Sequence, residues 1–153
     1  MSEGVTYEQQ LEKYGKILRT NVGVSMLPLL REGRDVMIIE RPSGRLKRYD
    51  VPLYRRGEDY VLHRIIKVKS GGYDIIGDNC VRVERDVKEE QIIGVLTGII
   101  RDGKEYSLDS FTYKLYCHLW CDFLYIRILL LKIKFLCKGA LRRTRSLLSR
   151  KEK

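Results

Sequence analysis

Residues 61–80 read VLHRIIKVKSGGYDIIGDNC, two β-rich runs separated by the short turn signal KSGG. Runs rich in valine, isoleucine and tyrosine are typical of strands, and a short glycine-containing loop joins antiparallel neighbours. The pattern therefore predicts that VLHRIIKV pairs with YDIIG. This pairing brings His63 and the GDN segment, residues 77–79, into one part of a sheet.

Similar runs flank this hairpin between about residues 34 and 100, namely VMIIE, VPLYR and QIIGVLTGII. The segments RPSGR, RRGED, KSGG and GDN punctuate them, and RRGED has the composition of a second hairpin turn. No helical pattern lies between the runs. Parallel strands need long crossover connections, usually helices, so a parallel sheet is not expected. We expect an antiparallel, mostly β domain over residues 21–108.

A helix is predicted before this domain, within residues 1–20. The stretch YEQQLEKYGKIL, residues 7–18, has apolar residues at three- and four-residue spacing, interrupted by Gly15. The N-terminus lacks the apolar core of a secretory signal, so we expect no leading membrane anchor.

Residues 109–153 form the third segment, an apolar or amphipathic helix with a basic tail. On a helix one face carries Leu115, Leu119, Phe123, Ile126, Leu130 and Ile133. Asp122 and Arg127 would each cost roughly 2.5–3.5 kcal/mol at the centre of a bilayer. The segment is thus expected either to pack on the β domain or to lie in a membrane interface, and spanning remains open because its apolar content is high.

Charge favours a phosphate-bearing surface as a partner. The chain has 30 basic and 20 acidic residues, a net charge of +10, and its last 16 residues contain a single acid. No recognition-helix, zinc-finger or aromatic-basic pattern is present, so nucleic acid is not expected. An anionic membrane surface, contacted through residues 114–153, fits the tail. We expect a membrane-associated protein, peripheral or held by one C-terminal helix.

The cysteines do not suggest a metal site. They lie at positions 80, 117, 121 and 137, and Cys117 and Cys121 are one helical turn apart with His118 between them. Further ligands at zinc-like spacing are missing, so these thiols are interpreted as packing residues in a reducing compartment. No metal and no cofactor are expected.

One serine interrupts an apolar run, NVGVSMLPLL, residues 21–30. A serine hydroxyl is a weak nucleophile that needs an adjacent base, itself often held by a third group. Ser25, His63 and an acid from GDNCVRVE would supply this set, and both Asp78 and Glu84 are candidates for the acid. A turn serine and a core histidine remain the alternatives for either residue taken alone.

A family resemblance unites these segments. GVSMLPLLREGRDVMII resembles the nucleophile box of type I signal peptidases, VLHRII resembles their second box, and GDNC resembles their Gly-Asp-Asn box, in the same order. The bacterial enzymes and the related self-cleaving repressors have a lysine base. His63 is similar instead to the histidine of the endoplasmic reticulum and archaeal branch.

The resemblance implies a coiled antiparallel β fold and roles for particular residues. Ser25 would be the nucleophile, with its backbone N–H as one oxyanion donor, and His63 the general base. Six positions after Asp78, where that branch has its triad aspartate, this chain has Glu84. Met26 and Pro28 would shape the nucleophile loop and the substrate cleft.

The expected function is therefore that of a serine endopeptidase of the signal peptidase type. Its substrate would be a signal or leader peptide of a precursor protein, and a single dedicated precursor suits the small size. Small residues before the cleavage site are expected from the resemblance. The alternative is a non-catalytic signal-peptidase-like module that binds lipid or nucleic acid through its basic tail.

Overall fold

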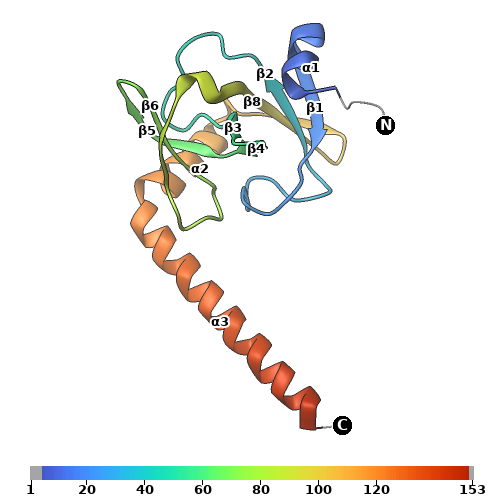
Figure 1. Cartoon of the computed structure of the whole chain (residues 1–153), viewed down its shortest axis with the longest axis vertical. Helices are drawn as coiled ribbons and strands as arrows, with labels where there is room; N and C mark the ends of the chain where they lie inside the picture. The colour runs from blue at the N-terminus through green and yellow to red at the C-terminus, as the bar shows by residue number, and fades with distance from the viewer. Residues whose placement is uncertain (1–4, 152–153) are drawn as a thin grey trace.

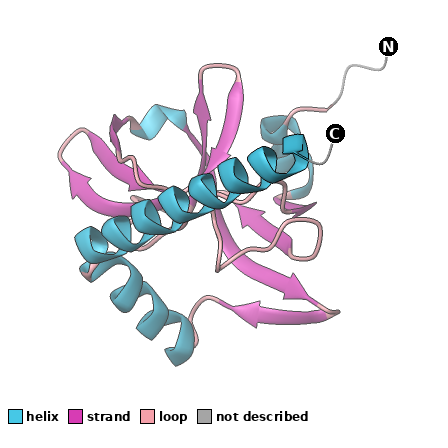
Figure 2. Ribbon diagram, turned by 90° about the horizontal axis from the view of Figure 1, so that it is seen from below, coloured by secondary structure: helices cyan, strands magenta, loops and turns pink. Residues whose placement is uncertain are grey.

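Two antiparallel sheets form the body of the protein in the computed structural model, which describes residues 5–151 and side chains up to Lys138 (Figures 1 and 2). The helices are α1 (Tyr7–Tyr14), the short 3-10 helix η1 (Glu89–Gln91), α2 (Phe111–Asp122) and α3 (Leu124–Lys151). The strands are β1 (Lys16–Thr20), β2 (Val36–Glu40), β3 (Pro52–Arg56), β4 (Asp59–Leu62), β5 (Arg64–Lys69), β6 (Gly72–Ile76), β7 (Glu84–Val87), β8 (Ile92–Arg101) and β9 (Lys104–Ser107).

The larger sheet has the strand order β1-β2-β8-β3-β4, with β9 also paired to β8. The smaller sheet has the order β5-β6-β7, and every strand pair in the described residues is antiparallel. The larger sheet curls into a half-barrel. The predicted fold class is confirmed: a mostly β, curled antiparallel domain with a short N-terminal helix and C-terminal helices.

The N-terminal helix is shorter than predicted. Thr6 caps its start, because the Thr6 hydroxyl accepts from the Gln9 backbone N–H at 3.2 Å and the Gln9 side chain accepts from the Thr6 N–H at 2.9 Å. Gly15 ends it with a left-handed φ of 72°. The predicted continuation to Leu18 was wrong, since residues 16–20 pair with β2 as a strand.

The two predicted hairpins are confirmed, but the long run around His63 is not one strand. β3 and β4 are joined through RRGED, and β5 and β6 through KSGG. YVLHRIIKV breaks at His63, where the chain leaves the larger sheet as β4 and enters the smaller one as β5. His63 therefore lies at the junction of the two sheets, not within a strand.

Two clusters of buried side chains form the core. One lies under the larger sheet and includes Leu11, Ile17, Met26, Leu30, Ile39, Val51 and Leu96. The other fills the space between the sheets and contains Leu46, Tyr54, Ile65, Tyr73, Ile75 and Val87. Met26 and Leu30 belong to the first cluster, so the loop that carries Ser25 is anchored in the core on both sides of its turn.

The C-terminal helices contact the β domain through a face that the sequence did not single out. Cys117, Cys121, Arg127 and Leu131 are buried, whereas the predicted apolar stripe from Leu115 to Ile133 is exposed. α2 lies against the domain and α3 runs away from it (Figure 1). Among the described residues, no helix combines the length and apolar character that crossing a bilayer requires.

Candidate active site

Ser25 occupies a tight turn between β1 and β2. The Leu30 N–H donates to the Met26 carbonyl at 3.0 Å, which closes the turn, and the Leu27–Pro28 peptide bond is cis. Met26 points into the core with 1% of its surface exposed, whereas Pro28 is exposed. Met26 thus anchors the loop in the core, while the neighbouring Ser25 is only half-buried.

The Gly-Asp-Asn loop lies directly on the Ser25 turn. The Asn79 backbone N–H donates to the Ser25 carbonyl at 2.7 Å, and the Asn79 side-chain amide donates to the Val24 carbonyl at 3.1 Å. Two segments more than 50 residues apart in the sequence are therefore joined at the candidate nucleophile. Asn79 holds the serine loop by its backbone and its side chain at once.

Gly77 is the point of closest approach between the candidate residues. A Cβ built at Gly77 would lie 2.7 Å from Cys80 Sγ, 2.8 Å from the Ser25 carbonyl oxygen and 2.9 Å from His63 Nε2. Cβ atoms are not found this close to other heavy atoms, so only glycine fits here. Its lack of a side chain lets His63 Nε2 approach the Ser25 backbone.

Glu84 contacts the other nitrogen of the His63 ring. Glu84 Oε1 lies 3.1 Å from His63 Nδ1, and the Tyr54 hydroxyl lies 3.3 Å from the same nitrogen. A carboxylate facing Nδ1 favours the tautomer with the proton on Nδ1, which leaves Nε2 as an acceptor. Arg56 binds the same Glu84 oxygen at 3.2 Å from the solvent side.

The surroundings of His63 keep its ring neutral near pH 7. Burial lowers the pKa of His63 below its ordinary value of 6.5, while the charge and hydrogen bond of Glu84 raise it in part. Burial also raises the pKa of Tyr54 far above 10, so that side chain stays protonated. His63 therefore has a free basic Nε2 in the form needed to accept a proton.

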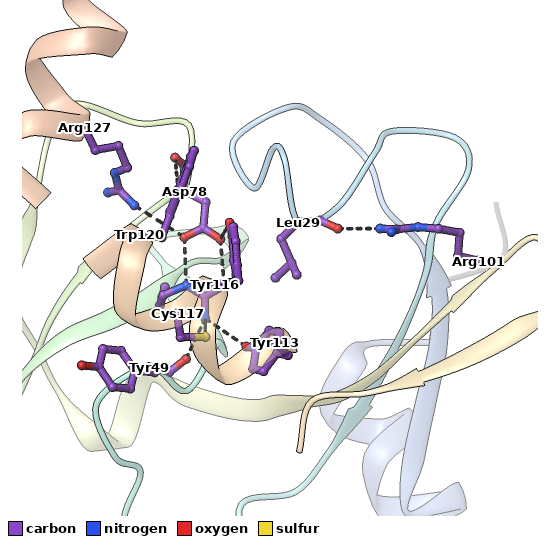
Figure 3. A network of polar contacts seen from close by, with 10 residues as sticks. Leu29, Tyr49, Asp78, Arg101, Tyr113, Tyr116, Cys117, Trp120 and Arg127 are labelled. Atoms are coloured by element: carbon purple, nitrogen blue, oxygen red, sulfur yellow. Dashed lines mark hydrogen bonds and ion pairs between the residues drawn. The ribbon is translucent and has the colours of Figure 1, made fainter. Parts of the chain in front are cut away.

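Asp78 is fully buried, in a polar network that α2 and α3 help to form (Figure 3). Its two oxygens accept from Arg64 at 2.9 and 2.7 Å, and the Tyr116 hydroxyl donates to it at 2.8 Å. Trp120 Nε1 donates to the Asp78 backbone carbonyl at 2.9 Å. Both candidate acids thus have clear partners, and it is Glu84, not Asp78, that hydrogen-bonds His63.

Arg127 from α3 completes this network. Its guanidinium is 5% exposed, lies 3.8 Å from Asp78 Oδ1 and stacks over the Trp120 ring at 5.8 Å. Burial lowers the pKa of Arg127, and the Asp78 charge opposes that shift. α2 and α3 therefore contact the loop that holds Ser25 through three side chains around one residue, Asp78.

Two cavities meet at His63. The first, of about 400 Å³, is lined by Ser25, His63, Cys80 and apolar residues that include Val22, Met26, Met37, Leu53 and Leu62. The second, of about 560 Å³, contains Glu84, Tyr54 and Arg82. None of the hydrogen bonds of residues 5–138 joins Ser25 Oγ to His63. The two side chains line one space that is large enough to hold a peptide segment between them.

The remaining cysteines and His118 have packing or local roles. Cys117 and Cys121 are buried free thiols, as predicted, and Arg64 donates to Cys117 Sγ at 3.1 Å. His118 Nδ1 lies 3.0 Å from the carboxylate of Asp122, on the same exposed helix surface. The described residues contain no group of three metal-ligating side chains.

Tyr54 and Arg56 contact the candidate site although the sequence did not indicate them, and Asn79 lies in the expected Gly-Asp-Asn box without having been assigned a role. A tyrosine in a β-rich run has the pattern of an ordinary core residue, and Asn79 has that of a turn residue.

No family model, no curated protein and no solved structure matches this chain.

Proposed function

We propose that this protein is a serine endopeptidase in which Ser25 is the nucleophile, His63 the general base and Glu84 the group that orients His63. The observation that carries the proposal is the position of His63: Nδ1 lies 3.1 Å from Glu84, and both Nε2 and the Ser25 carbonyl oxygen lie next to Gly77. A base held by an acid on its far side and lying beside a serine supports the proposal, because a serine hydroxyl needs such a base to become a nucleophile.

The chemistry follows from these positions. Ser25 Oγ attacks the peptide carbonyl while His63 Nε2 takes its proton and later gives it to the leaving amine. Water then hydrolyses the acyl-enzyme with His63 again as the base, which restores Ser25. The Ser25 backbone N–H is one donor to the oxyanion. Hydrogen bonds of this kind are often long without substrate and tighten when it binds.

The cavity beside Ser25 suits an extended peptide. It lies between the end of β1 and β4, which are the edge strands of the larger sheet, and its lining combines apolar side chains with polar ones. Edge strands offer backbone groups to an added strand. The proposed substrate is therefore a signal or leader segment of a precursor protein, bound as a strand across the open side of the half-barrel.

A serine-reactive phosphonylating probe tests the proposal. Mass mapping of the labelled protein is expected to find the adduct on Ser25 in the wild type and none in His63→Ala, because without the base the hydroxyl is not activated. Asn79→Ala and Ser43→Ala serve as comparisons, one at the loop contact and one on an exposed loop. Labelling of Ser25 that is equal in His63→Ala would remove the proposed base. No label together with no cleavage of small-residue peptides would favour a non-catalytic module.

Glu84→Gln is expected to lower kcat/KM by roughly a hundredfold or more while the protein stays folded, because the amide cannot hold the imidazolium that forms during proton transfer. Glu84 raises the pKa of His63. Its removal should therefore move the acid limb of the kcat/KM profile to lower pH. The pH profile of peptide cleavage measures both effects, and Glu58→Gln, at an exposed turn, is the matched control. An unchanged acid limb would exclude Glu84 as the partner of His63.

A further inference from the structure

The first half of α3 leaves most of its apolar side chains exposed. Arg127 is buried against the β domain, whereas Tyr125, Ile126, Leu129, Leu130, Ile133 and Leu136 are exposed by 49 to 86%. These six residues form the outer face of α3. Helices on a protein surface normally bury their apolar stripe. Within the described residues, the outer face therefore has no surface to pack against, although apolar stripes of this kind are normally covered.

The outer face is continuous and bordered by lysines. At about 100° per residue, its six positions cover an arc of roughly 140° on the side away from Arg127 and Leu131. Lys132 and Lys134 lie at the two edges of this arc, and both are exposed. The helix is thus divided into a domain-facing side, an apolar outer side and a basic border on each flank.

We propose that the outer face of α3 docks on an anionic lipid bilayer, with the helix lying in the interface. The basic borders favour this occupant, because lysines at the edge of an apolar arc reach headgroup phosphates while the arc enters the acyl region. The sequence has no acidic residue from Phe123 to Lys151, and the stretch after Cys137 is rich in arginine and lysine. Such a segment is attracted to anionic lipid.

Charge argues against a second copy of the chain as the occupant. In a two-fold pair the same surface meets itself, so the lysine borders of one α3 would face those of the other with no carboxylate on the helix to compensate. An apolar face with one sign of charge at its rim suits a surface of the opposite sign.

α3 leaves the β domain on the side that carries the Ser25 loop. The loops that follow β1 and β6 lie at the edge of the β domain from which α3 runs (Figure 1). Figure 2, seen from below, shows α3 in front of that side of the domain, in the direction in which the helix extends. The inference does not depend on peptide cleavage, and lipid binding is measured without a substrate.

Vesicle co-sedimentation tests the inference with the full chain. Binding is expected to vesicles of phosphatidylcholine with about 30% phosphatidylglycerol, weak on pure phosphatidylcholine, and weaker as salt rises from about 50 to 500 mM. Leu129→Ser/Ile133→Ser should weaken partitioning by about tenfold or more. Lys132→Gln/Lys134→Gln should cost about fivefold per lysine, since each contributes about 1 kcal/mol near an anionic surface.

The control variants carry the same types of substitution, leucine to serine and lysine to glutamine, outside α3. Leu18→Ser, on the exposed side of β1, and Lys67→Gln/Lys104→Gln, on β5 and β9, should leave binding unchanged. Wild-type binding that is unaffected by Leu129→Ser/Ile133→Ser would overturn the inference. Sedimentation velocity without lipid tests the alternative occupant. If the wild type forms dimers that Leu129→Ser/Ile133→Ser does not form, the outer face binds a second copy of the chain and the inference is overturned.

Discussion

Ser25→Ala is expected to abolish peptide cleavage, with a fall in kcat/KM of at least about a thousandfold, because Ser25 Oγ is the atom proposed to form the acyl-enzyme. Its free energy of unfolding should stay within about 0.5 kcal/mol of the wild type, since the hydroxyl makes no hydrogen bond within the described residues and the turn is held by Met26 and Leu30. Activity is measured on a peptide with small residues before the cut, and stability by urea unfolding.

Ser43→Ala, in an exposed loop, is the control for loss of a hydroxyl elsewhere. Cleavage that survives in Ser25→Ala would require another nucleophile. Cys80 is the nearest candidate, since its sulfur lines the same cavity as His63. Burial raises the pKa of the Cys80 thiol, which disfavours the reactive thiolate.

Asp78→Asn is expected to cost about 3–5 kcal/mol of stability, because it leaves the buried Arg64 guanidinium without a counter-charge. Arg64 and Asp78 are both fully buried and joined by two hydrogen bonds. Arg127 then faces the uncompensated Arg64 across the same space. Thermal or urea unfolding measures the loss, which contrasts with the small loss expected for Glu84→Gln.

Asp59→Asn, at the exposed start of β4, controls for the change from acid to amide. A loss below about 1 kcal/mol in Asp78→Asn would mean that Arg64 finds other acceptors. Cleavage by the folded fraction of Asp78→Asn should continue, because Glu84 and not Asp78 hydrogen-bonds His63. A folded but inactive Asp78→Asn would restore Asp78 as a candidate for the orienting acid.

The hairpins could be predicted because their signals are local. RRGED and KSGG specify turns within a few residues, and the register of β5 with β6 follows, with Arg64 opposite Ile76. The break at His63 has no such signal. It depends on pairing with distant segments, since the His63 N–H donates to Pro52 and the Ile65 N–H to Asp50. The β-rich run YVLHRIIKV contains no turn residue, so its sequence cannot reveal that its two halves join different sheets.

The choice between the two acids was also beyond sequence reasoning. His63 and Arg64 are adjacent, and adjacent residues in extended chain point to opposite sides. Glu84, opposite Ile75 in β7, reaches the His63 side, and Asp78 reaches the Arg64 side. The face of α2 that contacts the β domain could not be predicted for a related reason. It is determined by the buried Arg64–Asp78 pair, so tyrosine, cysteine and tryptophan face inward and leucines outward.

The contacts of Asp78 also set the shortest chain that keeps the site intact. Tyr116 and Trp120 supply two of its hydrogen bonds, and both follow residue 108, where the β-rich sequence ends. A fragment cut at that point would expose the Arg64–Asp78 pair to water and free the loop that holds Ser25. The segment after the strands is therefore part of the same cooperative unit as the strands, at least as far as α2.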